Sequence, residues 1–437
     1  MATEPRSSER RGGERVAEGT WVPGADGSGF GIEHLPYGVV RPTGEAPRVA
    51  VRIGDRALDL AVLADAGLLA LPGLSASALR APALNGFLAL GRDVWSETRA
   101  RLIELLDVRG PGASDVGALG ERALVPLAEV EALLPVAVGD YVDFYSSLEH
   151  ASNLGRIMRP GGDPVLPNWR HLPVAYHGRA GSIVVSGTPI RRPCGQRPPH
   201  APSEVPSFGP ERQLDFELEL GFVTGPGLPS GARIPAAVAD EHIFGFLLLN
   251  DWSAREIQRW EAQPLGPFLG KSFATSVAAW ITPLEALAAH RVHGAPQDPP
   301  PLAYLHTDEP WALEIDLEVA IVPAGSRVEL TLSRTNAREL YWNAAQQLTH
   351  ATSGGSALRA GDLFASGAIS GLDPGSYGSL IELTSGGSTA LQVGDGSRTF
   401  LEDGDTVIMR AVAAGGDRRP RLELGEVSGT VLAAAED

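Results

Sequence analysis

Five acidic residues of this 437-residue chain have types and positions that could do chemistry together. Three of them, Asp215, Glu217 and Glu219, alternate strictly with apolar residues. A period of two is typical of a β-strand, so the three carboxylates should point to one face. The other two are Asp143, between aromatic residues, and Asp251, which follows a run of apolar residues.

Acids stacked along one face of a strand repel one another. Burying an ion costs several kcal/mol unless an opposite charge compensates it. If the five acids converge, a divalent cation with oxygen ligands is the simplest compensator, which means Mg²⁺, Ca²⁺ or Mn²⁺. The alternative is a solvated strand face that carries an acid at every second position. The spacing by itself leaves both interpretations open.

The segment Gly266–Ser272 resembles a phosphate-binding loop but has three residues, not four, between its first glycine and the Gly-Lys pair. The residues after it favour a strand rather than a helix, which excludes a nucleotide-triphosphate site of that type. Lys271 could instead project from a tight turn as a fixed positive charge.

A strand also runs into a helix near Arg255 and Gln258. The two residues are three apart, so they share one helix face, and Ser253 is a plausible N-cap. Ligand sites often form at such places, although an ordinary surface helix would show the same pattern.

His150 lies seven residues after Asp143. The chain has no His-Glu-x-x-His motif and no Gly-x-Ser-x-Gly motif, which argues against a typical zinc hydrolase and a serine hydrolase of the nucleophile-elbow type. A histidine that acts as a general base on water is the economical interpretation for a metal hydrolase. The alternative is a structural or exposed histidine.

Composition excludes several kinds of partner. The net charge of −17 argues against nucleic acid or an anionic membrane as the main partner. No apolar run approaches the ~20 residues of a membrane span. The single cysteine, Cys194, excludes an internal disulfide and is consistent with a cytoplasmic protein. Residues 1–28 have no apolar segment at their start and are expected to be a disordered tail.

Residues 29–135 are expected to form a small N-terminal domain. Alternating apolar residues surround Gly54-Asp55, a hairpin signal. Apolar residues at helical spacing predict a helix over 84–106, and a Gly-rich polar stretch predicts a loop over 107–121.

Residues 136–437 are expected to be a second, mainly β domain, because short strand-like runs alternate with Gly, Pro, Asp and Asn. Helical patterns are few, and the best of them cover 253–261 and 336–350. The fold class is therefore mainly β, of the α+β type.

The chain resembles the fumarylacetoacetate hydrolase family from about Phe30 onward. The resemblance is carried by dense blocks of sequence, namely Gly139–Ser147, Pro167–Trp169, Pro173–Ala180, Val184–Arg192, Leu214–Leu220, Asn250–Arg255, Pro264–Phe273, Tyr341–Trp342, Gln346–His350 and Gly361–Leu363. It implies an SH3-like N-terminal barrel, a β-rich catalytic domain and a homodimer. The implied activity is metal-dependent hydrolysis of the C–C bond of a β-diketone, most directly 4-fumarylacetoacetate, a small diketo acid, to fumarate and acetoacetate at the end of tyrosine and phenylalanine degradation.

The resemblance also implies residue roles. A Ca²⁺ or Mg²⁺ ion would be held by Asp143, Glu217, Glu219 and Asp251, and a second cation would lie at Asp251, Lys271 and Thr275. Asp215 is not among the implied ligands. His150 is the implied base, oriented by Glu382. Oxyanion stabilisation falls to Arg255, Gln258 and Lys271, and substrate contact to Tyr145, Arg159, Tyr176 and Gln258.

Two positions depart from the family pattern. Ala262 stands where the family has a substrate-contacting Tyr, and Ala368 where it has a substrate-contacting Thr. Both changes remove a hydroxyl and enlarge the expected pocket. They motivate an alternative in which the same chemistry acts on another acylpyruvate-like or secondary-metabolite 1,3-dicarbonyl compound. A non-catalytic binding protein on the same fold is disfavoured by the intact His150 and Glu382.

Overall fold

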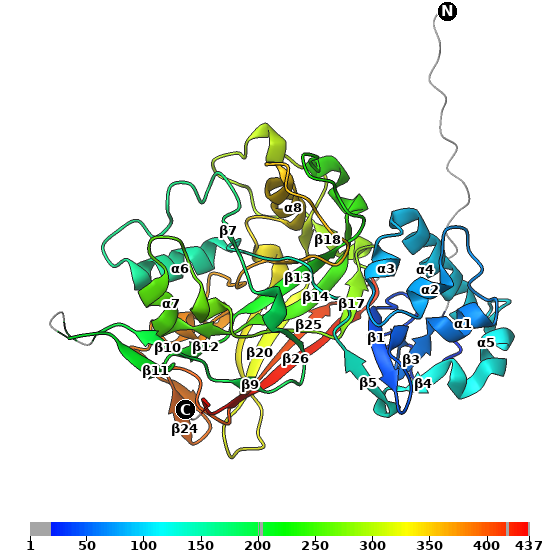
Figure 1. Cartoon of the computed structure of the whole chain (residues 1–437), viewed down its shortest axis with the longest axis horizontal. Coiled ribbons are helices and arrows are strands. Elements are labelled where there is room, and N and C mark those ends of the chain that lie inside the picture. Colours follow the sequence, from blue (N-terminus) through cyan, green and yellow to red (C-terminus); the bar gives the residue numbers. More distant parts are fainter. Residues whose placement is uncertain (1–18, 200, 202–203, 417–418, 436–437) are drawn as a thin grey trace, which may run out of the picture.

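The structure is a computed structural model that describes residues 19–199, 201, 204–416 and 419–435 (Figure 1). Strands dominate it, which confirms the expected β-rich α+β class. The N-terminal part lies at one end of the molecule, and the chain from about residue 140 onward forms the larger remainder (Figure 1).

The N-terminal part is an antiparallel meander with helices packed beside it. Its strands are β1 (Tyr37–Pro42), β2 (Arg48–Ile53), β3 (Arg56–Asp59), β4 (Leu124–Pro126) and β5 (Val130–Leu133). Its helices are α1 (Leu60–Asp65), α2 (Ala76–Leu79), α3 (Asn85–Leu88), α4 (Arg92–Leu106) and α5 (Ala113–Leu119). The hairpin expected at Gly54-Asp55 joins β2 to β3. Closure of the meander into an SH3-like barrel stays a prediction.

Three N-terminal expectations need correction. The helix expected over 84–106 is two helices, because Gly91 takes a φ of 87° between α3 and α4. The stretch 107–121 contains α5 rather than a continuous loop. Residues 1–18 of the expected tail lie outside the described part, but 19–28 are packed: Val22 and Ala25 are buried, and Trp21 donates from Nε1 to the carbonyl of Leu105 over 3.0 Å.

One large sheet joins the two parts of the chain, because β1 pairs with β17 (Trp280–Pro283). The sheet continues through β14 (Ile243–Asp251), β13 (Leu218–Thr224), β22 (Leu363–Ala365), β6 (Tyr141–Phe144) and β7 (Ala175–His177), with β16 (Thr275–Val277) and β8 (Ile183–Val185) at its side. All residues of β13 and β14 are buried, so these central strands are covered on both faces.

A second sheet covers the first, and its strand β26 contacts β14, β16 and β17 (Figure 1). Its order is β21 (Leu330–Asn336), β20 (Asp316–Val322), β25 (Thr406–Ala413), β26 (Leu422–Leu432) and β9 (Ile190–Arg191). Four short pairs complete the strands: β10 (Cys194–Arg197) with β11 (Ser207–Pro210), β12 (Leu214–Asp215) with β15 (Ser253–Ala254), β18 (Arg291–Val292) with β19 (Ala312–Leu313), and β23 (Leu391–Val393) with β24 (Gly396–Arg398).

The helices of this larger part are α6 (Leu148–Met158), α7 (Arg255–Glu261), α8 (Ala344–Thr352) and α9 (Leu380–Leu383). The helix expected over 336–350 begins later, because Asn336 ends β21 and Asn343 with Gln346 forms the capping box of α8. Ser253 is not the cap of α7, since it lies in β15. Within the described ranges, no helix has both the length and the apolar character needed to cross a membrane.

Candidate functional site

Four of the five acids converge in the centre of the large sheet. Asp143 lies on β6, Glu219 on β13 and Asp251 at the end of β14, while Glu217 directly precedes the first residue of β13. Each is at most 4% exposed. One carboxylate oxygen from each lies within 4.8 Å of the others. The alternative of a solvated strand face is therefore excluded.

Cross-strand neighbours supply hydrogen bonds to this carboxylate cluster, because directly paired residues point to the same face of a sheet. Tyr176 pairs with Asp143 across β6 and β7, and its hydroxyl lies within hydrogen-bond distance of Asp143 Oδ2, at 2.7 Å, and of Asp251 Oδ2, at 3.0 Å. Thr275 pairs with Asp251, and its Oγ1 donates to Asp251 Oδ1 over 3.1 Å.

The backbone of Gly367 holds the fourth acid. Its N–H donates to Glu219 Oε2 over 2.9 Å. Gly367 has a φ of 78°, and a Cβ atom there would lie 2.2 Å from the carbonyl oxygen of Phe144. Only glycine fits this left-handed turn against the strand.

Asp215 lies outside the carboxylate cluster. The alternating stretch is not one strand, since it divides into β12 and β13 around Phe216 and Glu217. Asp215 accepts a hydrogen bond from Nε of Arg255 over 2.8 Å. Strict alternation thus indicated extended backbone correctly, but it placed one acid too many on the shared face.

Two buried cations border the carboxylate cluster. Nζ of Lys271 donates to Glu217 over 2.5 Å and to Asp251 over 2.7 Å. Nη2 of Arg255 lies 2.8 Å from Glu217 Oε1 as an ion pair, yet no acceptor is aligned with its N–H groups. That nitrogen therefore keeps donor capacity for another oxygen.

The pKa values show how uneven this compensation is. Burial raises the pKa of Asp143 and Glu219 well above the ordinary carboxyl range, and neighbouring carboxylates add to the effect. At Glu217, burial acts in the same direction, but the charges of Lys271 and Arg255 outweigh it and lower the pKa. Lys271 and Arg255 therefore do not offset the burial of Asp143 and Glu219, which favour the protonated form while no ion is bound.

A divalent ion fits the part of the site formed by Asp143 and Glu219. Asp143 Oδ1 and Glu219 Oε1 are buried and have no hydrogen-bond partner. An all-oxygen set of four carboxylates suits Ca²⁺ or Mg²⁺. The ammonium of Lys271 has no lone pair, and the neighbouring acids overcome burial and raise its pKa. Lys271 could therefore join a second cation site only through its carbonyl oxygen.

His150 and Glu382 form a buried pair beside this cluster. Ser147 caps α6 by accepting a hydrogen bond from the N–H of His150. Nδ1 of His150 lies 2.6 Å from Glu382 Oε2, and Nε2 lies 3.8 Å from Glu217 Oε1. With the proton on Nδ1, the lone pair of Nε2 faces the cluster.

Three further side chains hold Glu382, and sequence reasoning missed them. Ser370 and Ser379 donate to Oε2 over 3.0 and 2.6 Å, and Asn153 donates to Oε1 over 3.0 Å. Burial would raise the pKa of Glu382, but the interaction with His150 and the hydrogen bonds from Ser379 and Asn153 lower it. Two signals were present: Asn153 follows His150 by three residues on α6, and Ser379 precedes Glu382 by three.

The remaining expected site residues lie around this centre. Gln258 accepts from Nη1 of Arg255 over 3.1 Å. The ring of Tyr145 meets that of His150 edge-on, with centroids 5.3 Å apart. Tyr145 and Arg159 line one cavity of about 190 Å³. Ala262 is the C-cap of α7, and Ala368 is buried two residues before Ser370.

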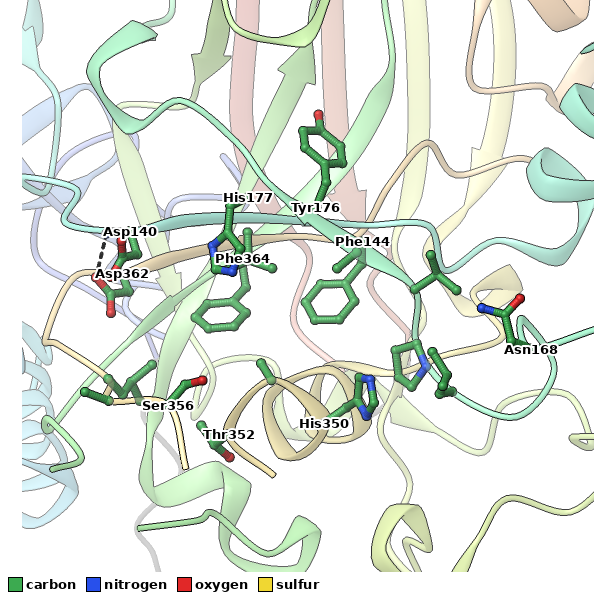
Figure 2. Close-up of a pocket in the computed structure, with 18 residues that line it drawn as sticks. Asp140, Phe144, Asn168, Tyr176, His177, His350, Thr352, Ser356, Asp362 and Phe364 are labelled. Carbon is green, nitrogen blue, oxygen red and sulfur yellow. Dashed lines mark hydrogen bonds between the residues drawn. The ribbon is translucent and has the colours of Figure 1, made fainter. Parts of the chain in front are cut away.

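A larger cavity, of about 540 Å³, lies on the other face of the sheet. Phe144 and Phe364 point into it toward α8, whereas the side chain of Tyr176 points the opposite way (Figure 2). Because Tyr176 contacts Asp143 and Asp251, the carboxylate cluster and this cavity are separated by the strands. The candidate site is therefore identified by its buried charged residues and not by the volume of a cavity.

The fold and this geometry define a class of β-rich enzymes in which grouped carboxylates could hold a divalent ion beside a His–Glu pair. Comparison with known proteins identifies the family within this class. Residues 33–135 match the family model described as fumarylacetoacetase N-terminal, and residues 141–432 match fumarylacetoacetate (FAA) hydrolase C-terminal.

Similar relatives span almost the whole chain. The fumarylacetoacetase of Oryza sativa subsp. japonica is 47% identical, over 97% of this chain and 99% of its own. That of Homo sapiens is 45% identical, over 95% and 99%. The solved fumarylacetoacetate hydrolase of Exiguobacterium antarcticum is 16% identical, with a TM-score of 0.50 over 91% of this chain and 99% of that chain, and it supports the fold alone. The chain belongs to the fumarylacetoacetate hydrolase family.

Chelation should destabilise the protein, and more strongly as the pH rises. In the ion-free protein Asp143 and Glu219 have raised pKa values, so the folded state binds more protons than the unfolded state. Stability is then lost as the pH rises above the ordinary carboxyl pKa of about 4. A bound divalent ion instead favours the ionised carboxylates and stabilises the fold by mass action. Melting curves at pH 5 and pH 8, with EDTA or with Ca²⁺, measure both effects.

The control is the double variant Asp143→Asn, Glu219→Gln, in which neither the ion nor the pH should change the melting temperature in this way. Equal melting temperatures for wild-type protein with EDTA and with Ca²⁺ or Mg²⁺ at pH 8 would contradict a divalent-ion site.

Proposed function

We propose that this protein hydrolyses 4-fumarylacetoacetate to fumarate and acetoacetate, the last step of tyrosine and phenylalanine degradation. The observation that carries the proposal is the buried cluster of Asp143, Glu217, Glu219 and Asp251 beside the His150–Glu382 pair. Identities of 45–47% to fumarylacetoacetases over nearly the full chain support it.

His150 is the proposed general base. With Nδ1 bonded to Glu382, its Nε2 can accept a proton from a water molecule in the space beside Glu217. The water oxygen then bonds to the carbonyl carbon that becomes a carboxyl carbon of fumarate. The C–C bond breaks, its electron pair leaves with the acetoacetate fragment as an enolate, and that carbon takes up a proton. The four donors around Glu382 keep the carboxylate ionised and fixed, so it can stabilise the protonated imidazole.

Arg255, Lys271 and Gln258 are the proposed donors to the oxygen on which negative charge develops. Nη2 of Arg255 faces Glu217 Oε1 at 2.8 Å and has no further acceptor in the protein. Lys271 is a fixed positive charge, since Glu217 and Asp251 hold it. Removal of one oxyanion donor typically costs ~3–4 kcal/mol of transition-state stabilisation.

Asp143, Glu217, Glu219 and Asp251 would hold the Ca²⁺ or Mg²⁺ ion. Such an ion, when bound, supplies Lewis-acid stabilisation to the oxygens of a β-diketone. A second cation at Asp251, Thr275 and the carbonyl oxygen of Lys271 is part of the proposal. Tyr145, Arg159 and Tyr176 are the proposed substrate contacts, because the first two line one cavity, the ring of Tyr145 contacts that of His150, and Tyr176 reaches the acids.

The proposal includes a homodimer and a cytoplasmic location, with a small diketo acid as the ligand. The family resemblance supports the dimer, and the low cysteine content is consistent with the cytoplasm. Light scattering on the purified protein measures the oligomeric state directly. A different 1,3-dicarbonyl substrate, motivated by Ala262 and Ala368, is not favoured by the full-length similarity to fumarylacetoacetases.

Purified protein should consume fumarylacetoacetate only with a divalent ion. Loss of the diketone absorbance in Ca²⁺ or Mg²⁺ follows the reaction, an EDTA-treated sample is the control, and fumarate and acetoacetate should appear in equal amounts. A folded, ion-loaded protein with no turnover would contradict the proposal, and activity on an acylpyruvate panel would then favour the alternative substrate.

Loss of the base should lower turnover without unfolding the protein. His150→Gln should reduce kcat by about 10²–10⁴-fold, because general-base help is of that size. His290→Gln is the matched control, since His290 is also buried but bonds to the carbonyl of Pro420. Wild-type kcat in the His150→Gln enzyme would remove His150 from the mechanism.

A further inference from the structure

Asp215 is a fully buried carboxylate that the proposed mechanism leaves without a role. Its two oxygens accept four hydrogen bonds. Oδ1 accepts from the backbone N–H of Phe216 over 2.8 Å and of Leu380 over 2.7 Å. Oδ2 accepts from Nε of Arg255 over 2.8 Å and from the N–H of Ile381 over 3.0 Å. A carboxylate has about four lone-pair sites, so none is left for a cation.

Three of these four donors belong to two separate parts of the candidate site. Arg255 opens α7, where its other nitrogens face Glu217 and Gln258. Leu380 and Ile381 open α9, and the next residue is Glu382, the partner of His150. The carboxylate of Asp215 therefore holds Nε of Arg255, the proposed oxyanion donor. It also holds the first turn of α9, which carries Glu382, the partner of His150.

The charge of Asp215 also matters for Arg255. The guanidinium lies between two carboxylates, with Nε at Asp215 and Nη2 at Glu217. Without Asp215 the guanidinium would be free to turn toward Glu217 and make a two-pronged pair with it, which is the geometry that Arg and carboxylate prefer. Nη2 would then lose the donor capacity that the substrate needs.

We propose that Asp215 is a positioning residue that sets the geometry between Arg255 and the His150–Glu382 pair. The inference rests on the proposed hydrolysis, but it makes Asp215 neither a metal ligand nor a group that touches the substrate. Its loss should therefore change kcat rather than KM or ion binding.

The test is Asp215→Asn, which keeps the size of the side chain. Its NH₂ group cannot accept a hydrogen bond, so it would face two of the N–H donors that now bind one oxygen of Asp215. We expect kcat for fumarylacetoacetate to fall by about 10²-fold, since a displacement of ~1 Å of positioned groups can cost that much. KM and the Ca²⁺ affinity measured by calorimetry should stay at their wild-type values.

The matched control is Asp405→Asn. Asp405 is equally buried and also holds an arginine and backbone amides, since it accepts from Arg398 over 2.8 and 3.0 Å and from the N–H groups of Ala324 and Glu402 over 2.9 Å. None of its partners belongs to the candidate site. Both variants should melt at lower temperature than wild type, but only Asp215→Asn should lose kcat.

Three results would overturn the inference: wild-type kcat in folded Asp215→Asn, an equal loss of kcat in folded Asp405→Asn, or a loss of Ca²⁺ binding in Asp215→Asn. If Asp215→Asn does not fold, Asp215→Ser, which leaves room for a water molecule between the donors, is assayed in its place by the same criteria. An inactive wild-type protein would contradict the proposed function instead, so the two failures are distinguishable.

Discussion

The constraint on which the rest of the structure depends is the cost of holding several carboxylates in the dry centre of a sheet. Asp143, Glu217, Glu219 and Asp251 are buried close together, where electrostatic repulsion is weakly screened. Lys271 and Arg255 compensate only the side nearest Glu217. The buried oxygens of Asp143 and Glu219 that have no partner are the direct sign that the protein is built around a further positive charge.

In this fold the strands carry most of the acids, whereas the first turns of helices carry other proposed catalytic groups. The buried strands β6, β13 and β14 carry Asp143, Glu219 and Asp251, and cross-strand pairing places Tyr176 beside Asp143 and Thr275 beside Asp251. His150, Arg255 and Glu382 come instead from the first turns of α6, α7 and α9. Asp215 connects two of these helix starts, so it belongs to the architecture of the site although it is not part of the carboxylate cluster.

Much of this arrangement could be predicted from the sequence. Alternation around Glu217 and Glu219 indicated extended backbone, and the family resemblance named the acids, His150 and Glu382. Periodicity could not show that Asp215 departs from its neighbours, because the break at Phe216 depends on pairing with β15, a contact between distant residues. The start of α8 was misplaced for a related reason: two cap-like asparagines, Asn336 and Asn343, stand seven residues apart, and the tertiary pairing of β21 decides between them. Ser370 could not be foreseen, since its bond to Glu382 depends on how the segment after β22 packs against α9.

The most direct test of this account is the metal content of the purified protein after exhaustive dialysis against metal-free buffer, measured by mass spectrometry. The account predicts at least one Ca²⁺ or Mg²⁺ ion per chain in the wild type, and loss of that ion in the double variant Asp143→Asn, Glu219→Gln. A wild-type protein that retains no divalent ion and takes none up from millimolar Ca²⁺ or Mg²⁺ would contradict it.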